Sequence, residues 1–330
     1  MPNSWSYIPE APAAAEQARR TMPAVPPAPA LPSAPSPAPA QRPPVAAPEF
    51  PVRRPVRTLA DLIVPGPVGE RLRNALRQVQ YHDVLFQQWN LRRIDPHRAG
   101  VALNLYGPPG TGKTMAAEAL AAHLGKGFID VNYAEIESRY VGDTPKNIVR
   151  CFEAAEKAGA VLVFNEADSI LGSRLSSVTQ SADHSVNLTR SVMLNQLDAF
   201  TGVVVFTTNF AANYDSAFVR RILAHVHFDL PDRETLARLW ATLLPDELPR
   251  ADDVDADVLA AASTGLAGGD LVNVIVAAAA RAVERTGASR RVTADDLFAE
   301  LVTVRAAQAA VGRPSARQEL LVEQVEVPTD

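Results

Sequence analysis

Short apolar runs alternate with helical patterns through the middle of the chain. The runs predict buried strands at 101–106, 127–132, 160–164, 202–208 and 224–230. Segments with apolar residues every three or four positions lie between these runs, and another precedes them at 69–89. Buried strands that alternate with helices form a parallel sheet with helices on both faces. We therefore expect an α/β domain over 58–231, built on a five-stranded parallel sheet.

The pattern changes after Pro231, where the strand signal stops. Helical periodicity continues in the segments 233–244, 256–263, 269–287 and 293–310. Thr293 is placed to cap the last of these helices, with Asp296 three residues further on. The pattern predicts a small helical domain over 232–311, followed by a flexible tail over 312–330.

The first 57 residues have a different composition from the rest. They hold 16 of the 27 prolines, mixed with alanine and serine. Because proline lacks an amide donor and has a fixed φ, we expect a disordered, extended Pro/Ala-rich tail over 1–57. Such a tail is either a solvated linker or a tether that recruits a substrate. In the second case, the segment "SWSYIPE" near the start of the tail would be a docking motif.

Composition and charge narrow the class of protein. A net charge of −5 and a pI of about 5.7 argue against a nucleic-acid coat or a membrane-surface binder. The chain has no apolar run long enough to cross a membrane and no export signal at its start, so we expect a cytoplasmic protein without membrane insertion. The single cysteine, Cys151, lies in a helical pattern and is expected to be a buried packing residue.

The segment "GPPGTGKT" follows the first strand and begins the next helix, as a phosphate-binding loop requires. Its glycines let backbone amides wrap phosphate oxygens, and the helix N-terminus adds positive potential. Lys113 is expected to reach the β- and γ-phosphates and the Thr114 hydroxyl to bind Mg²⁺. The predicted cofactors are therefore ATP and Mg²⁺. The predicted binding residues of the loop are Gly107, Pro108, Pro109, Gly110, Thr111, Gly112, Lys113 and Thr114.

A second polar element, "VLVFNEAD", ends the third strand. In such sites a terminal acid holds the metal through water, and the next acid activates the attacking water. Here the first position is Asn165, which has no charge, while Glu166 supplies the base. Loss of the charge should weaken metal binding by about 10–100-fold. Two interpretations stay open: an active but slow ATP hydrolase, and an ATP-gated scaffold with little turnover.

Residues 58–305 resemble an AAA+ ATPase of the AAA subgroup, similar to the microtubule-severing and membrane-scission remodellers and their bacterial relatives. "GPPGTGKT" resembles the Walker A motif, and "VLVFNEAD" resembles Walker B with Asn165 as the departure. "VVFTTNF" resembles the sensor 1 strand, and "GLAGGDLVNV" resembles the sensor 2 region. The resemblance implies the five-stranded sheet and helical lid that the hydrophobic pattern also predicts.

The resemblance also implies roles for particular residues. Asn209 would help to place the attacking water, and Gly269, beside Gly268, would lie near the base. Arg220 and Arg221 in "NYDSAFVRRI" are the candidate arginine fingers, which would reach the γ-phosphate of a neighbouring subunit. Since they are adjacent, either one can be the finger.

The resemblance further implies a homo-oligomeric ring, expected to be a hexamer, that threads a protein client through its pore. Tyr140 and Val141 would face the pore as an aromatic–aliphatic pair that grips a peptide. The polar segment 173–190 would supply a second, flexible loop with a solvated histidine, His184. A nucleic-acid motor is a further alternative, but the acidic core and the pore pair argue against nucleic acid as a partner.

Overall fold

The computed structural model describes residues 49–95, 99–132, 136, 144–172, 181–209 and 214–311. Both predicted pore residues, Tyr140 and Val141, lie outside the described residues. The same is true of residues 1–48 and 312–330, which make up most of the two predicted tails.

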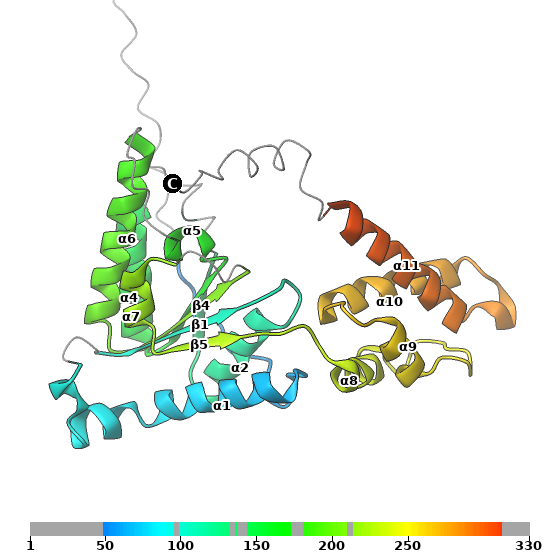
Figure 1. Ribbon diagram of the computed structural model, residues 1–330, viewed down its shortest axis with the longest axis horizontal. Helices are drawn as coiled ribbons and strands as arrows, with labels where there is room; N and C mark the ends of the chain where they lie inside the picture. The colour runs from blue at the N-terminus through cyan, green and yellow to red at the C-terminus, as the bar shows by residue number, and fades with distance from the viewer. Residues whose placement is uncertain are drawn as a thin grey trace, which may run out of the picture. The chain divides into compact units, whose positions relative to one another are not determined.

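The centre of the α/β domain is a five-stranded sheet, in which β1, β4 and β5 are labelled in Figure 1. All neighbouring strands are parallel, in the order β2-β3-β4-β1-β5. The strands are β1 (Val101–Tyr106), β2 (Phe128–Asn132), β3 (Val161–Asn165), β4 (Val203–Thr208) and β5 (Ala224–His227). The prediction of five parallel strands is confirmed. Because β3, β4 and β1 are consecutive in this order and run parallel, their carboxyl ends lie side by side at one edge of the sheet.

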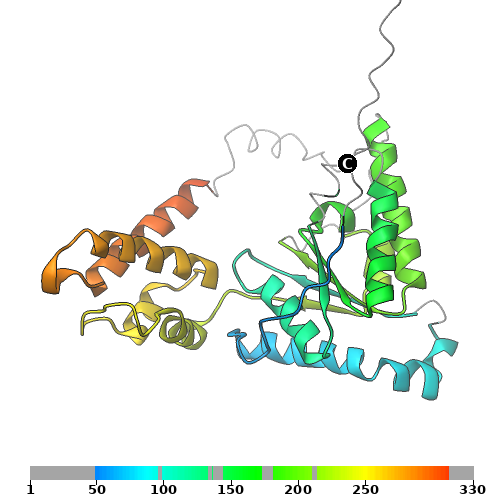
Figure 2. The ribbon, with the colours of Figure 1, turned by 180° about the vertical axis from the view of Figure 1, so that it is seen from behind.

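Helices cover both faces of this sheet (Figures 1 and 2). On one face, α1 (Gly66–Gln80) and α2 (Lys113–His123) pack on alternate residues of the strands, including Leu103 and Val205. The opposite face packs, through residues such as Phe164 and Phe206, against α4 (Thr144–Ala158), α6 (Ser181–Ala199) and α7 (Ser216–Arg221). Alternate strand residues thus enter two separate clusters, as expected for a sheet buried on both sides.

The smaller elements complete the domain. A four-residue helix, α5 (Asp168–Leu171), follows β3, while η1 (Val84–Gln88) and η2 (Leu91–Arg93) follow α1. Cys151 is fully buried on α4, and burial raises the pKa of its thiol. Its expected role as a packing residue is therefore confirmed by its surroundings.

One local prediction is wrong. The polar segment 173–190 was expected to be a flexible loop, but α6 begins at Ser181 and contains the backbone of His184. The physical reason lies further along α6, where Met193 and Leu194 are buried in the core. Packing of these buried residues stabilises the whole helix. The polar first half of α6 is therefore helical although it has few apolar residues at helical spacing. Residues 173–180 lie outside the described residues.

The helical domain contains α8 (Arg233–Leu243), α9 (Ala256–Ala262), α10 (Gly268–Val283), η3 (Gly287–Ser289) and α11 (Ala294–Val311). Its apolar cluster surrounds Trp240, whose indole nitrogen donates a 2.9 Å hydrogen bond to Ser263. No helix in the described part of the chain is long and apolar enough to cross a membrane.

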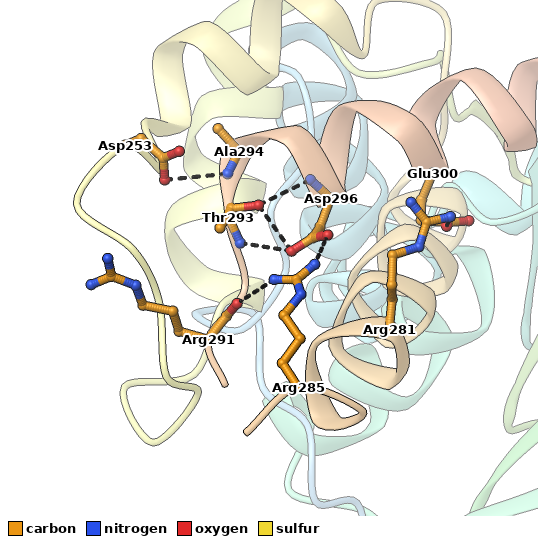
Figure 3. Close-up of polar contacts among 8 residues, drawn as sticks. All are labelled: Asp253, Arg281, Arg285, Arg291, Thr293, Ala294, Asp296 and Glu300. Atoms are coloured by element: carbon orange, nitrogen blue, oxygen red, sulfur yellow. Dashed lines mark hydrogen bonds and ion pairs between the residues drawn. The ribbon is translucent and has the colours of Figure 1, made fainter. Parts of the chain in front are cut away.

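The start of α11 is capped as predicted (Figure 3). The Asp296 carboxylate accepts hydrogen bonds from the backbone amide and the hydroxyl of Thr293, at 3.0 and 2.9 Å. Arg285 binds the other carboxylate oxygen and also donates to the carbonyl of Arg291 at 3.0 Å. The Arg285 guanidinium holds the pKa of Asp296 below its ordinary value.

Residues 50–57 contact the α/β domain, although the sequence places them in the tail. Arg53 forms an antiparallel β-bridge with Phe128, at N–O distances of 2.8 and 3.0 Å. The amides of Val56 and Arg57 both donate to the Glu118 carboxylate on α2. Proline is tolerated at a sheet edge, where every second amide is unpaired, so the composition of this segment does not prevent edge pairing.

Candidate nucleotide-binding site

The predicted phosphate loop connects β1 to α2, and its glycines are required by the backbone. Gly107, Gly110 and Gly112 have φ values of 139°, 74° and 94°, a region that other residues rarely adopt. At Gly107 a Cβ atom would also lie 2.2 Å from the carbonyl oxygen of Phe228. The loop can therefore expose its amides at the amino end of α2, where a phosphate would bind.

Lys113 is directed into this loop. It is 7% exposed, and its Nζ donates to the carbonyl oxygens of Gly107 and Pro108, at 2.8 and 2.7 Å. Burial lowers the pKa of Lys113, and the nearby charge of Asp168 partly opposes that shift. An ammonium group held by two carbonyls in a buried loop is suited to exchange those partners for phosphate oxygens.

Asn165, the unusual residue of the Walker B-like segment, connects several elements. Its Oδ1 accepts hydrogen bonds from the hydroxyls of Thr114 and Thr207, at 3.1 and 2.8 Å. Its Nδ2 donates to Oδ1 of Asp130, on the neighbouring strand β2, at 2.5 Å. The amide thus occupies the place between β3 and Thr114 where a metal-holding acid was expected.

Glu166 has a strained backbone. Its φ of 55° is in the left-handed region, which is uncommon for residues other than glycine, asparagine and aspartate. Such strain costs on the order of 1–3 kcal/mol and is concentrated at functional sites. The conformation turns the chain sharply after β3 and leaves Glu166 exposed at the carboxyl edge of the sheet.

The predicted residues of the loop, Walker B and sensor 1 are brought together. A cavity of about 490 Å³ is lined by Pro109, Gly110, Gly112, Lys113, Thr114, Met115, Asn165, Glu166, Thr207 and Asn209. The hydroxyl of Thr114, the amide oxygen of Asn165 and the carboxylate of Glu166 are hard oxygen donors of the kind that Mg²⁺ prefers. The residues present therefore fit a magnesium–nucleotide complex.

Three residues of the site were missed in the sequence. Asp168 accepts a 3.1 Å hydrogen bond from the backbone amide of Asn209 and so fixes the end of β4 next to β3. Thr207 and Asp130 are the two further partners of Asn165. A signal was present for two of them, since Asp168 is the last letter of "NEAD" and Asp130 is an acid inside a buried strand.

The sensor 2 glycines also lie near the phosphate loop. The amide of Gly269, in the first turn of α10, donates to the carbonyl oxygen of Gly110 at 3.1 Å. A Cβ atom on Gly269 would lie 3.2 Å from the Cα atom of Gly110, which is tighter than nine in ten real Cβ contacts. A glycine at this position therefore permits the contact between α10 and the loop.

The two candidate arginine fingers lie outside this cavity and have different surroundings. Arg221 forms a bidentate ion pair with Asp198 on α6, at 2.7 and 2.8 Å, and also donates to the carbonyl of Ala217. Its hydrogen bonds to Asp198 raise the pKa of the guanidinium. Arg220, in contrast, is exposed. Both line a separate cavity of about 220 Å³.

Comparison with known proteins agrees with this geometry. Residues 103–230 match the model of the family described as "ATPase family associated with various cellular activities (AAA)". This range contains β1 to β5 and the phosphate loop. Residues 103–230 are therefore similar to the AAA ATPase domain, and the resemblance to AAA+ ATPases is confirmed over this range.

Among curated proteins, the chain is similar to the 26S proteasome regulatory subunit 6B homologs of Encephalitozoon cuniculi and Dictyostelium discoideum. The identities are 38% over 173 residues and 32% over 223 residues, which cover 50% and 66% of this chain and 43% and 53% of those proteins. It is also 35% identical to the ATP-dependent zinc metalloprotease FtsH 3 of Sphaerobacter thermophilus over 189 residues, 56% of this chain and 38% of that protein. The chain thus spans about half the length of these relatives or less.

Proposed function

We propose that this protein hydrolyses ATP and uses the energy to remodel or unfold a protein client. The observation that carries the proposal is that Lys113, Thr114, Glu166 and Asn209 line one cavity, with Glu166 held in a strained conformation at its edge. A site that only stored nucleotide would need the loop and its lysine, but not a strained acid beside the metal-binding hydroxyl.

The residues divide the chemistry between them. The loop amides and Lys113 bind the phosphates, and Lys113 exchanges its carbonyl partners for phosphate oxygens. Thr114 and Asn165 would hold Mg²⁺, which neutralises charge on the β- and γ-phosphates. Glu166 orients the attacking water and accepts its proton. Asn209, which follows β4 and whose backbone amide is held by Asp168, would position the same water.

The remodelling role is supported by the relatives. Their names are those of regulatory subunits of the 26S proteasome and of an ATP-dependent metalloprotease. We infer a homo-oligomeric ring, expected to be a hexamer, in which Tyr140 and Val141 grip the client in the pore. Arg220 or Arg221 would complete the site of the neighbouring subunit. The alternative of an ATP-gated scaffold is supported by Asn165 alone. The alternative of a nucleic-acid motor is supported by the shared fold and by no particular residue.

The substitution Glu166→Gln tests this function. ATP binding should persist, because the loop is intact, while hydrolysis should fall by about 10²–10⁴-fold because the water loses its base. The arrested ring should also retain its client on affinity capture. Glu153→Gln, at an exposed position on α4, is the matched control and should hydrolyse ATP as wild type does. A wild-type protein without hydrolysis at saturating Mg²⁺ would instead support the scaffold.

A further inference from the structure

We propose that Asp130, on β2, supplies the carboxylate charge that position 165 lacks and orients the Asn165 amide toward the magnesium site. Asp130 is thus a positioning residue that acts through Asn165. The inference rests on the proposed nucleotide site, but it concerns how that site binds Mg²⁺ and does not require that the protein hydrolyse ATP.

The sheet register places the two residues together. Asn132 is the Cα partner of Asn165, and Asp130 is the Cα partner of Val163, so Asp130 and Asn165 are diagonal neighbours on adjacent strands. Residues two apart on a strand share a face, which puts both side chains on the face covered by α2. Their side chains meet in the 2.5 Å hydrogen bond from Asn165 Nδ2 to Asp130 Oδ1.

This contact fixes the direction of the amide. A carboxylate only accepts hydrogen bonds, so the nitrogen of Asn165 must face Asp130 and its oxygen must face the opposite way. The oxygen then accepts from Thr114 and Thr207, which agrees with the same orientation. Without Asp130, the amide could rotate and present its NH₂ group to Thr114, where a cation would be repelled.

Asp130 also returns a negative charge to the site. Its carboxylate lies one hydrogen bond from the amide that contacts Thr114. A charge–dipole contact of this kind polarises the amide and increases the electron density on its oxygen. The second carboxylate oxygen of Asp130 binds Arg53 at 2.9 Å, but the Arg53 side chain is 58% exposed, so solvent screens that positive charge.

The test uses the full chain with Glu166→Gln as the starting protein. It compares the single substitution Asp130→Asn with the exchange, in which Asp130→Asn and Asn165→Asp are combined. The readout is the Mg²⁺ concentration at half-maximal binding of a fluorescent ATP analogue, which needs no hydrolysis. Asp130→Asn should raise that concentration about tenfold, because the site loses its charge and the amide its fixed direction. Adding Asn165→Asp to Asp130→Asn reverses the hydrogen bond and keeps the net charge, so the exchanged protein should return to within about threefold of the starting value.

Two further variants complete the test. Asn165→Asp alone places two carboxylates in contact, so its unfolding temperature without Mg²⁺ should fall, and the exchange should recover it. Arg53→Gln removes the other partner of Asp130 and should not raise the Mg²⁺ requirement. The proposal is overturned if Asp130→Asn leaves the requirement unchanged, if the exchange recovers neither property, or if Arg53→Gln has the same effect as Asp130→Asn. A protein that binds no nucleotide at all would refute the proposed site instead.

Discussion

The contrast between Arg220 and Arg221 leads to a prediction that separates a structural arginine from one that acts on a neighbouring subunit. Substitution Arg221→Ala removes two hydrogen bonds to Asp198 and leaves that carboxylate without its guanidinium. The two side chains are 34% and 31% exposed. The cost should therefore lie between that of a surface pair and that of a fully buried pair, at about 1.5 kcal/mol. For a domain of this size, that loss lowers the unfolding temperature by about 3–6 °C.

The assay combines thermal unfolding with ATPase activity of mixtures. Asp198→Asn should lower the unfolding temperature similarly, and the double variant should cost less than the sum of the two singles, because both remove one interaction. Because Arg220 is more exposed than Arg221, Arg220→Ala should lower the unfolding temperature by less than Arg221→Ala does. When mixed with wild type, however, it should inhibit activity beyond simple dilution. The reasoning is refuted if Arg221→Ala is as stable as wild type and if Arg221→Ala inhibits the mixtures while Arg220→Ala does not.

Three further predictions concern other parts of the chain. Lys113→Ala should abolish nucleotide binding in a titration, because the loop loses its cation, and an affinity within a few-fold of wild type would place the nucleotide elsewhere. The lowered pKa of Asp296 means that its contribution to stability is present at neutral pH and is lost as the pH falls below about 4. Asp296→Asn should therefore flatten the dependence of the urea midpoint on pH in that range, and an unchanged slope would contradict it. Tyr140→Ala should leave basal ATPase activity intact but stop client remodelling, whereas unfolding of this variant would show that Tyr140 packs in the core.

The elements that the sequence predicts well are those whose signal is local. Each strand of the sheet is a short apolar run, and the phosphate loop has a fixed spacing of glycines and lysine, so both can be recognised without knowledge of the fold. The cap of α11 was also predictable, because Thr293 and Asp296 interact three residues apart. The start of α6 was not, since its polar first turns depend on buried residues more than ten positions away.

The features that the sequence does not predict are contacts between residues that are distant along the chain. The acid in "FIDVN" is visible in the sequence, but its contact with Asn165 depends on the order of strands β2 and β3. The pairing of Arg53 with Phe128 is equally hidden, because an isolated bridge has no periodicity. Likewise, only the packing of α6 against α7 shows that Arg221 is engaged by Asp198.

The diagonal pair of Asp130 and Asn165 has a consequence for how such a chain can change over time. Moving the acid from position 130 to position 165 requires two substitutions, and each order passes through a disfavoured intermediate. One intermediate has two adjacent carboxylates, and the other has two amides and no charge. We therefore expect positions 130 and 165 to vary together among related chains, with an acid at one position accompanied by an uncharged partner at the other.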